Sequence, residues 1–149
     1  MLTRQQIFNT AYHGLAAQGF ERSFQEDLLR PNKGRCQYRG DNGRRCALGY
    51  CIPDSLYSEN LEGVTIYKLP RHFLDKIGIR KKDIGFANNL QQVHDFSVNP
   101  SDLRFKLELF AAKYGLTIPE LPVKADGANI EVANAEDQNA SEQREYTTA

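Results

Sequence analysis

The stretch at residues 36–57 reads CQYRGDNGRRCALGYCIPDSLY and holds all three cysteines of the chain. Asn42 and Gly43 supply the positive φ angles that a tight hairpin turn requires, so we expect a hairpin over residues 36–52. An apolar segment follows the turn, and Gly49 within it allows a close backbone approach. We expect the remaining elements to pack around this segment.

Helical patterns flank the hairpin. Thr3 and Gln6 have the form of a capping box, and Gly19 is a stop signal, so a first helix is expected between them. Its apolar stripe is Ile7, Phe8, Ala11, Tyr12 and Leu15. A second, shorter helix is expected from the apolar set Phe20, Phe24, Leu28 and Leu29.

The second half of the chain also carries helix signals. Pro70, Asp83 and the pair Asn99-Pro100 each favour a helix start. Leu103, Leu107, Phe110 and Tyr114 form the apolar stripe of the last of these helices. Residues 64–67 are compatible with a short strand or an extended connector. The predicted fold class is therefore α+β, a mostly helical single domain with a small β-hairpin.

Composition sets the domain limits. The chain has 149 residues, of which 40% are hydrophobic, and that length suits one compact core, expected in residues 1–122. Residues 123–149 carry two Lys+Arg against six Asp+Glu and few large apolar side chains, which predicts a disordered acidic tail. Such a tail serves solubility or acts as an interaction segment.

Compartment and redox state follow from what the sequence lacks. No apolar run is long enough for a membrane span, and the start, MLTRQQIFNT, does not have the layout of a secretion signal. We therefore expect a cytoplasmic protein without a membrane partner. The odd cysteine count favours reduced thiols over a disulfide framework.

A metal site is one chemical interpretation of the cysteines. Cys36, Cys46 and Cys51 together with His94 or His72 would make four zinc ligands. However, nine residues separate the first two cysteines and four separate the next two, unlike the paired knuckles of structural zinc sites. We expect no metal and no cofactor, and small apolar roles for the thiols.

A cysteine-dependent enzyme is the second interpretation. Cys46 would be the nucleophile, with its pKa lowered by the preceding Arg44-Arg45, and His94 would be the base, oriented by Asp95 or Asp102. Neighbouring Ala47 and Leu48 instead indicate burial of Cys46. Adjacent residues do not share a helix face, so a direct contact between His94 and Asp95 is not expected.

Macromolecular binding is the third interpretation. Residues 30–45 contain six cations and one acid, and residues 80–82 form a second basic cluster. Tyr38, Arg39, Arg44 and Arg45 are the predicted contact residues. A basic hairpin with an aromatic side chain suits phosphate groups, so nucleic-acid binding stands as an alternative to protein binding.

One resemblance adds to these interpretations. The pattern CxYRGxxGxxCAxGxxIPDxxY from Cys36 to Tyr57 is followed by Leu61-Glu62-Gly63 and later by LQxxHD ending in Asp95. Together these motifs resemble a family of small proteins from tailed phages and prophages. More distant actinobacterial proteins have Asn-Asp where this chain has His94-Asp95. The resemblance implies a compact helical domain and supplies no catalytic residue. It also implies an accessory role. We expect this role to be non-enzymatic binding of a host macromolecule, with a host protein favoured as the partner.

Overall fold

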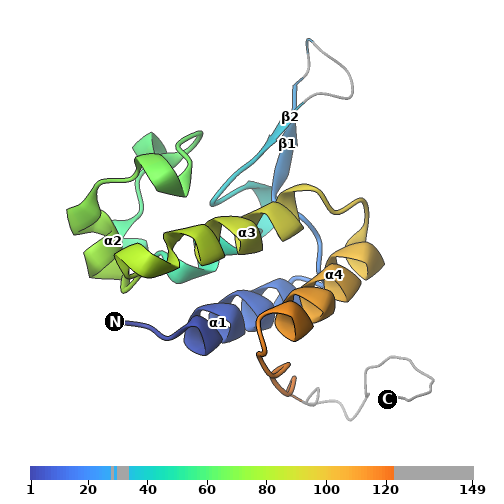
Figure 1. The fold of residues 1–149 in the computed structure, drawn as a ribbon. Helices are drawn as coiled ribbons and strands as arrows, with labels where there is room; N and C mark the ends of the chain where they lie inside the picture. Colours follow the sequence, from blue (N-terminus) through green and yellow to red (C-terminus); the bar gives the residue numbers. More distant parts are fainter. Residues whose placement is uncertain (28, 30–33, 123–149) are drawn as a thin grey trace, which may run out of the picture. The chain divides into compact units, whose positions relative to one another are not determined.

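The structure is a computed structural model that describes residues 1–27, 29 and 34–122 (Figure 1). Its described residues form four α-helices, several short 3₁₀ turns and one two-stranded antiparallel sheet. The predicted mostly helical α+β class is therefore confirmed. Residues 1–119 form one compact unit. The predicted tail at 123–149 lies outside the described residues.

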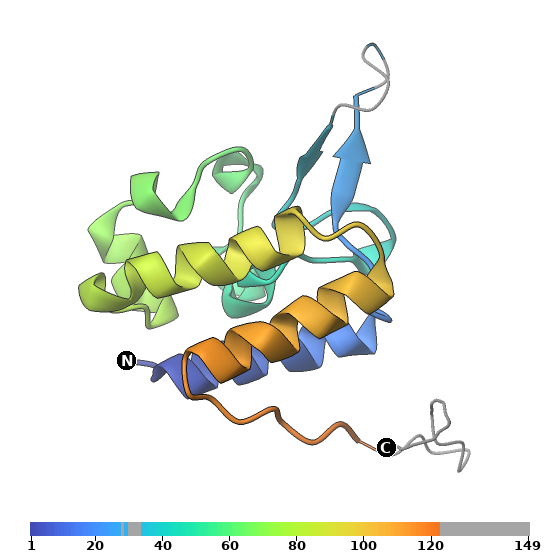
Figure 2. The same ribbon diagram turned by 45° about the vertical axis from the view of Figure 1, so that its right-hand side comes forward.

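Three helices build the core. They are α1 (Arg4–Ala17), α3 (Ile84–Asp95) and α4 (Pro100–Lys113). In Figure 1 and Figure 2, α1 and α4 run side by side, and α3 lies above both of them in these views. Phe110 of α4 joins them, since its ring stacks on Phe8 of α1 at 6.0 Å and tilts against Phe86 of α3 at 5.2 Å between ring centroids.

Local sequence signals account for the ends of these helices. The capping box of α1 is present, because the Thr3 hydroxyl accepts from the Gln6 amide and the Gln6 side chain accepts from the Thr3 amide. Asn99 caps α4 through the Asp102 amide, and Pro100 occupies the first turn. The predicted apolar stripe of α1 is buried along its whole length. Of the stripe predicted for α4, Leu103, Leu107 and Phe110 are buried.

The helix predicted from Phe20 to Leu29 is wrong. The chain turns at Gly19 and Phe20, both with positive φ, and then forms strand β1 (Phe24–Glu26), which pairs with β2 (Gly34–Cys36). All three residues of β1 are exposed, so an amphipathic helix there would have no face to bury. The two-stranded sheet consequently precedes the segment where we predicted the hairpin.

The hairpin expected at residues 36–52 is reduced to its turn. Asn42 and Gly43 adopt the predicted positive φ angles, 61° and 72°. Only one bridge, between Arg39 and Arg45, follows this turn within the described chain. The ladder does not extend, because the returning chain enters the 3₁₀ turn Leu48–Cys51. The backbone amide of Arg39 donates instead to the carboxylate of Glu62 at 3.0 Å.

Shorter elements complete the unit. Helix α2 (Arg71–Ile77) ends at Gly78 in the left-handed conformation. Residues 64–67, predicted as a strand or connector, lead into the 3₁₀ turn Ile66–Lys68. At the ends of the unit, the Leu2 amide donates to the Gly78 carbonyl. The Gln5 side chain forms two hydrogen bonds, of 2.8 and 3.0 Å, with the backbone of Thr117.

Candidate functional site

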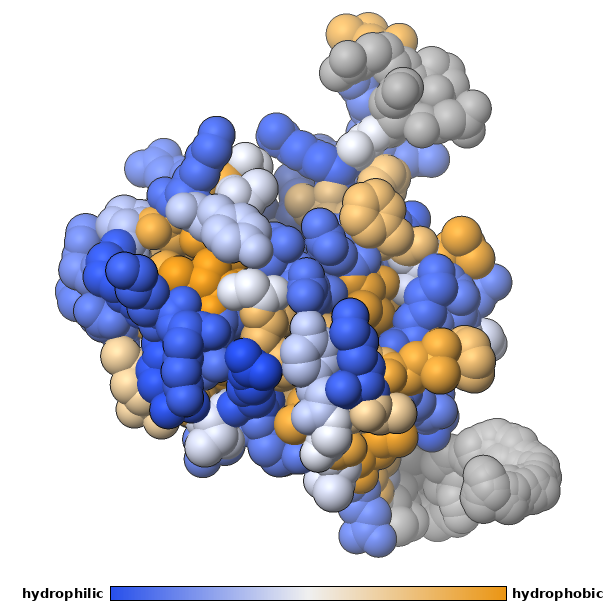
Figure 3. All heavy atoms as spheres, in the orientation of Figure 1, coloured by the Kyte–Doolittle hydropathy of each residue, from blue (hydrophilic) through white to orange (hydrophobic). Residues whose placement is uncertain are grey.

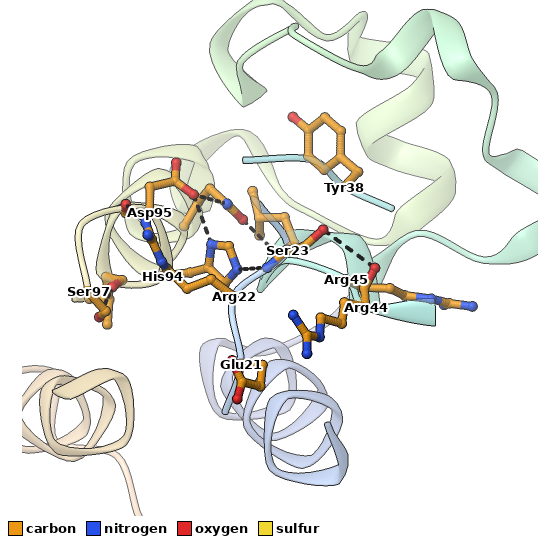
Figure 4. Close-up of polar contacts among 12 residues, drawn as sticks. Glu21, Arg22, Ser23, Tyr38, Arg44, Arg45, His94, Asp95 and Ser97 are labelled. Atoms are coloured by element: carbon orange, nitrogen blue, oxygen red, sulfur yellow. Dashed lines mark hydrogen bonds and ion pairs between the residues drawn. The ribbon is translucent and has the colours of Figure 1, made fainter. Parts of the chain in front are cut away.

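His94 lies in the last turn of α3 and is fully buried. Its Nε2 accepts a hydrogen bond of 3.0 Å from the Ser23 backbone amide, and its Nδ1 lies 3.0 Å from Asp95 Oδ1 (Figure 4). Because Nε2 is an acceptor, the proton sits on Nδ1 and is donated to the carboxylate. We call this group of His94, Asp95, Ser23, Arg22 and Cys36 the His94 junction.

His94 and Asp95 are in direct contact, so our expectation that these adjacent residues would not meet is wrong. Helix α3 ends at Asp95, so the carboxylate folds back over the last turn, where Asp95 Oδ1 also accepts from the side-chain Nε2 of Gln91 at 2.6 Å. Arg22 donates to the Asp95 carbonyl at 2.7 Å from the linker between α1 and β1. Sequence reasoning missed Arg22 and Ser23, since neither belongs to a motif.

The junction contains three residue types that ligate metals. Ligand atoms of Cys36, His94 and Asp95 lie within 4.8 Å of one another. For Nδ1 to bind a metal ion, the imidazole proton would move to Nε2, where it would face the Ser23 N–H as a second donor. The hydrogen bonding of the junction therefore favours a structural network over a metal centre.

The thiols are held in environments that oppose ionisation. Cys46 is buried, and its pKa is raised well above the ordinary value by burial, so the lowering expected from Arg44-Arg45 is wrong. Burial also raises the pKa of Cys51 to about 12. The pKa of Cys36 rises to about 12 through burial and the nearby Asp95 carboxylate. A nucleophilic cysteine requires the thiolate, which these sites disfavour.

The structure does not assemble the predicted catalytic set. Among the described residues, no hydrogen bond joins Cys46 to His94, whose Nε2 is engaged by Ser23. Asp102, the alternative orienting acid, accepts from the Val98 amide at 3.0 Å and pairs with Lys106 at 2.9 Å at the start of α4. These contacts place Asp102 in the capping of α4.

Alkaline pH is expected to destabilise the fold. Because the pKa of Cys51 is raised from 9.0 to about 12, its contribution is fully present below pH 9 and is lost as pH rises toward 12. The loss from Cys51 alone is about 2 to 3 kcal/mol at pH 11. Urea unfolding at pH 8 and pH 11 measures it, and Cys51→Ala should reduce the difference. An equal pH effect in wild type and Cys51→Ala would contradict this role.

The predicted contact arginines have unequal surroundings. Arg39 pairs with Asp54 at 2.8 Å, donates to the Ile52 carbonyl at 2.7 Å and lies over the Tyr57 ring at 4.4 Å. Arg45 shares Asp54 at 3.2 Å. Both guanidinium groups thus connect the turn at Asn42-Gly43 to the segment that contains Asp54.

Tyr38 is also an internal residue. It is 8% exposed, and its hydroxyl donates to the Val64 carbonyl at 2.6 Å. Its amide donates to Glu62 Oε1 at 2.9 Å, and Glu62 Oε2 accepts from the Tyr57 hydroxyl at 2.7 Å. Glu62 therefore organises this segment from 24 residues away in the sequence. The sequence offered no signal for it beyond its place in the resemblance motif.

Arg44 differs from the other three residues. Its carbonyl accepts from the Gly40 amide at 2.9 Å and from the Ser23 hydroxyl at 3.5 Å (Figure 4). Its side chain makes no ion pair or hydrogen bond with any residue that the structure describes. Arg44 is thus the member of the predicted set whose charge remains available.

Alanine substitutions should distinguish Arg39, whose side chain is engaged in internal contacts, from Arg44, whose side chain is not. Arg39→Ala is expected to lower the free energy of unfolding by about 1 to 2 kcal/mol. The change removes the hydrogen bond to the buried Ile52 carbonyl and the contact of the guanidinium with the Tyr57 ring. Arg44→Ala should change it by less than about 0.5 kcal/mol. Urea unfolding of both variants provides the measurement. Equal effects would contradict the structural assignment of Arg39.

A second basic surface lies on the elements around α2. Residues 68–82 contain six cations and one acid. Arg71 pairs with Asp75, and Arg80 pairs with the buried Asp83. The remaining cations are exposed and have no ion pair within the described chain; they are Lys68, Lys76, Lys81 and Lys82. We call these four lysines the basic ledge.

The basic ledge has one exposed aromatic neighbour, Tyr67, which is 62% exposed. The left-hand side of Figure 3, over α2 and the adjoining turns, is mostly hydrophilic. The sequence showed the cluster at residues 80–82. It did not show that Arg80 is engaged internally, since that depends on the position of Asp83.

Comparisons with known proteins return no relative. No protein family, no curated protein and no solved structure matches the chain. Within the described residues, none of the helices has the length and apolarity needed to cross a bilayer.

Proposed function

We propose that this chain is a small accessory protein of phage type that acts by binding a host protein in the host cytoplasm, without catalysis. One observation carries the proposal: Cys46, Cys51 and His94 are committed to the interior, whereas several surface cations have no ion pair with any residue that the structure describes. Cys46 and Cys51 are buried with raised pKa values, and both ring nitrogens of His94 are engaged. The phage character rests on the resemblance of residues 36–57.

The proposed contact surface is the basic ledge. Arg44, whose charge remains available among the four predicted contact residues, is a second proposed contact. Exposed lysines without intramolecular partners are attracted to acidic surfaces and steer association. We therefore propose a host protein with an acidic contact face.

Nucleic acid is the alternative partner. Two observations favour protein: the formal net charge of the chain is zero, and the ledge has one exposed aromatic residue, Tyr67, where single-strand binders use several. Binding to nucleic acid remains an outcome of the test rather than the proposal.

A pull-down from host lysate tests the proposal. We expect the intact chain to retain a discrete protein that resists nuclease treatment and is released by salt. Lys81→Glu/Lys82→Glu should abolish retention, and Arg44→Glu should weaken it. His72→Ala, a change at an exposed uncharged position on α2, serves as the control and should retain the protein.

Two outcomes would overturn the host-protein proposal. Nuclease-sensitive material that depends on the same lysines would assign nucleic acid as the partner. Retention unchanged by either charge reversal would place the contact elsewhere.

A further inference from the structure

Two prolines lie shortly after the helical core, in residues 118–122, which read Ile-Pro-Glu-Leu-Pro. Residues 116–122 form no helix, strand or turn, and Figure 2 shows them as an extended orange segment that follows α4. Ile118 is 46% exposed, and Glu120 and Pro122 are exposed as well. The segment is therefore accessible to a partner molecule.

The other described prolines have a structural role that these two lack. Pro53 and Pro70 immediately precede helical turns, and Pro100 lies in the first turn of α4. Proline favours such positions, because it has no amide hydrogen to donate and its φ angle suits a helix start. No element of the described chain begins at Pro119 or Pro122. The fold of the described residues therefore does not account for this pair.

Each of the two prolines follows a large aliphatic residue. The pair Ile118-Pro119 is repeated three residues later as Leu121-Pro122. A proline ring fixes its own φ angle at about −65° and disfavours the helical conformation for the residue before it. These four residues are thus restricted toward polyproline II, a left-handed helix with about three residues per turn. The restriction lowers the conformational entropy that is lost when the segment binds a partner.

The order of residues gives such a helix two apolar edges. Residues three apart lie on the same edge, so Ile118 and Leu121 share one edge. Pro119 and Pro122 share the next edge, and Glu120 lies on the third. The two apolar edges form a ridge on which the aliphatic-proline pairs are about 9 Å apart. One side of the segment is therefore apolar and the other is charged.

The segment leaves the core from a fixed point. The Leu116 amide donates to the Ala111 carbonyl at 2.8 Å, and Thr117 is held by its two hydrogen bonds to the Gln5 side chain. Beyond Thr117, the backbone of residues 118–122 makes no hydrogen bond with any residue that the structure describes. The backbone acceptors of this segment are therefore not used by the described part of the fold.

We propose that residues 118–122 dock into a protein domain that recognises polyproline II in an aromatic-lined groove. SH3 domains are one class of such domains, and they bind Pro-x-x-Pro segments whose helix is preformed. Lys124 stands two residues after the second proline in the sequence, so the partner is expected to have an acidic group beside its groove. The segment shares no residue with the basic ledge, so this binding does not depend on the proposed function.

Titration of the full chain with a purified SH3 domain tests the proposal. The probe is an SH3 domain whose peptide ligands contain two aliphatic-proline pairs and a following cation, and binding is followed by the amide signals of the isotope-labelled chain. We expect saturable shifts at residues 116–124. Pro119→Ala/Pro122→Ala should bind at least about ten-fold more weakly. Its far-UV circular dichroism spectrum should be unchanged, because the segment belongs to no helix or strand.

Glu120→Ala is the matched control. Glu120 lies on the edge that faces away from the groove, so its replacement should leave the affinity nearly unchanged. Lys124→Glu should weaken binding several-fold, and the difference should be larger at low salt than at high salt. Lys81→Glu/Lys82→Glu should bind like the intact chain, which separates this proposal from that of the basic ledge.

Three results would overturn the proposal. One is the absence of saturable binding at millimolar concentrations of the SH3 domain. The second is equal binding by the intact chain and by Pro119→Ala/Pro122→Ala. The third is an equal loss of affinity in the proline variant and in Glu120→Ala, because the two aliphatic-proline pairs would then not be what the partner recognises.

Discussion

Replacing Gly49 by alanine is expected to lower the free energy of unfolding by about 3 kcal/mol. A Cβ atom at Gly49 would lie 2.1 Å from the Tyr38 carbonyl oxygen and 3.0 Å from its carbonyl carbon. The Tyr38 backbone has little freedom to withdraw, because its amide is bound by Glu62 and its hydroxyl by the Val64 carbonyl. The added methyl group therefore separates the two segments around the turn.

Gly85→Ala is the matched control for Gly49→Ala. At Gly85, inside α3, the nearest atom to an added Cβ is the Tyr67 hydroxyl oxygen at 3.8 Å, an ordinary contact. Alanine is there expected to stabilise the protein by about 0.5 to 1 kcal/mol through its higher helix propensity. Urea unfolding followed by far-UV circular dichroism compares the two. Shifts of the same sign in both variants would contradict the close approach at Gly49.

His94→Ala is expected to lower the free energy of unfolding by about 3 kcal/mol. The change removes a fully buried ring and leaves the Ser23 amide without its acceptor. His94→Gln should cost less, because its side-chain oxygen can accept from that amide. The measurement is urea unfolding of both variants.

Amide exchange adds a local readout for His94. In His94→Ala, the Ser23 amide should exchange faster than in wild type, and the effect should extend to the turn, because the Ser23 hydroxyl contacts the Arg44 carbonyl. In His94→Gln, protection at Ser23 should be largely kept. Wild-type stability in His94→Ala, or equal losses in both variants, would show that the imidazole does not support this junction.

Local signals sufficed for much of the fold. The capping box at Thr3, the Asn99 cap and the Gly19 stop depend on residues within a few positions of one another, and each is found where predicted. The close approach at Gly49 was also predicted and is confirmed. These features follow from backbone sterics and nearby donors, which the sequence contains directly.

Long-range pairing was beyond the sequence. Phe24 has helical spacing with Phe20, but its partner is Cys36 in β2, and nothing in a single sequence identifies that pairing. The predicted hairpin stops at one bridge because the returning chain enters the 3₁₀ turn Leu48–Cys51, and the sequence did not show that Glu62 binds the amide of Arg39. The spacing of residues in the sequence shows which side chains are apolar, whereas strand pairing and hydrogen-bond partners depend on the folded structure.

The candidate site shows the same division. The basic composition around Arg39 and Arg45 is plain in the sequence, but their shared partner Asp54 is recognised only once the chain is folded. The number of arginines near the turn therefore overestimated the contact surface there, since an arginine whose guanidinium is engaged in intramolecular contacts contributes little to binding a partner.

The double hydrogen bond between Gln5 and Thr117 brings the two ends of the compact unit together at the start of α1. Residues 2 and 117 are therefore suited to covalent joining by a short linker. New termini opened at the exposed Asn42 would fall outside the helical core. A circularly permuted chain of this kind would retain the contacts of α1, α3 and α4 while changing their order of synthesis from α1, α3, α4 to α3, α4, α1. The helical core would then be assembled from a chain in which α4 precedes α1.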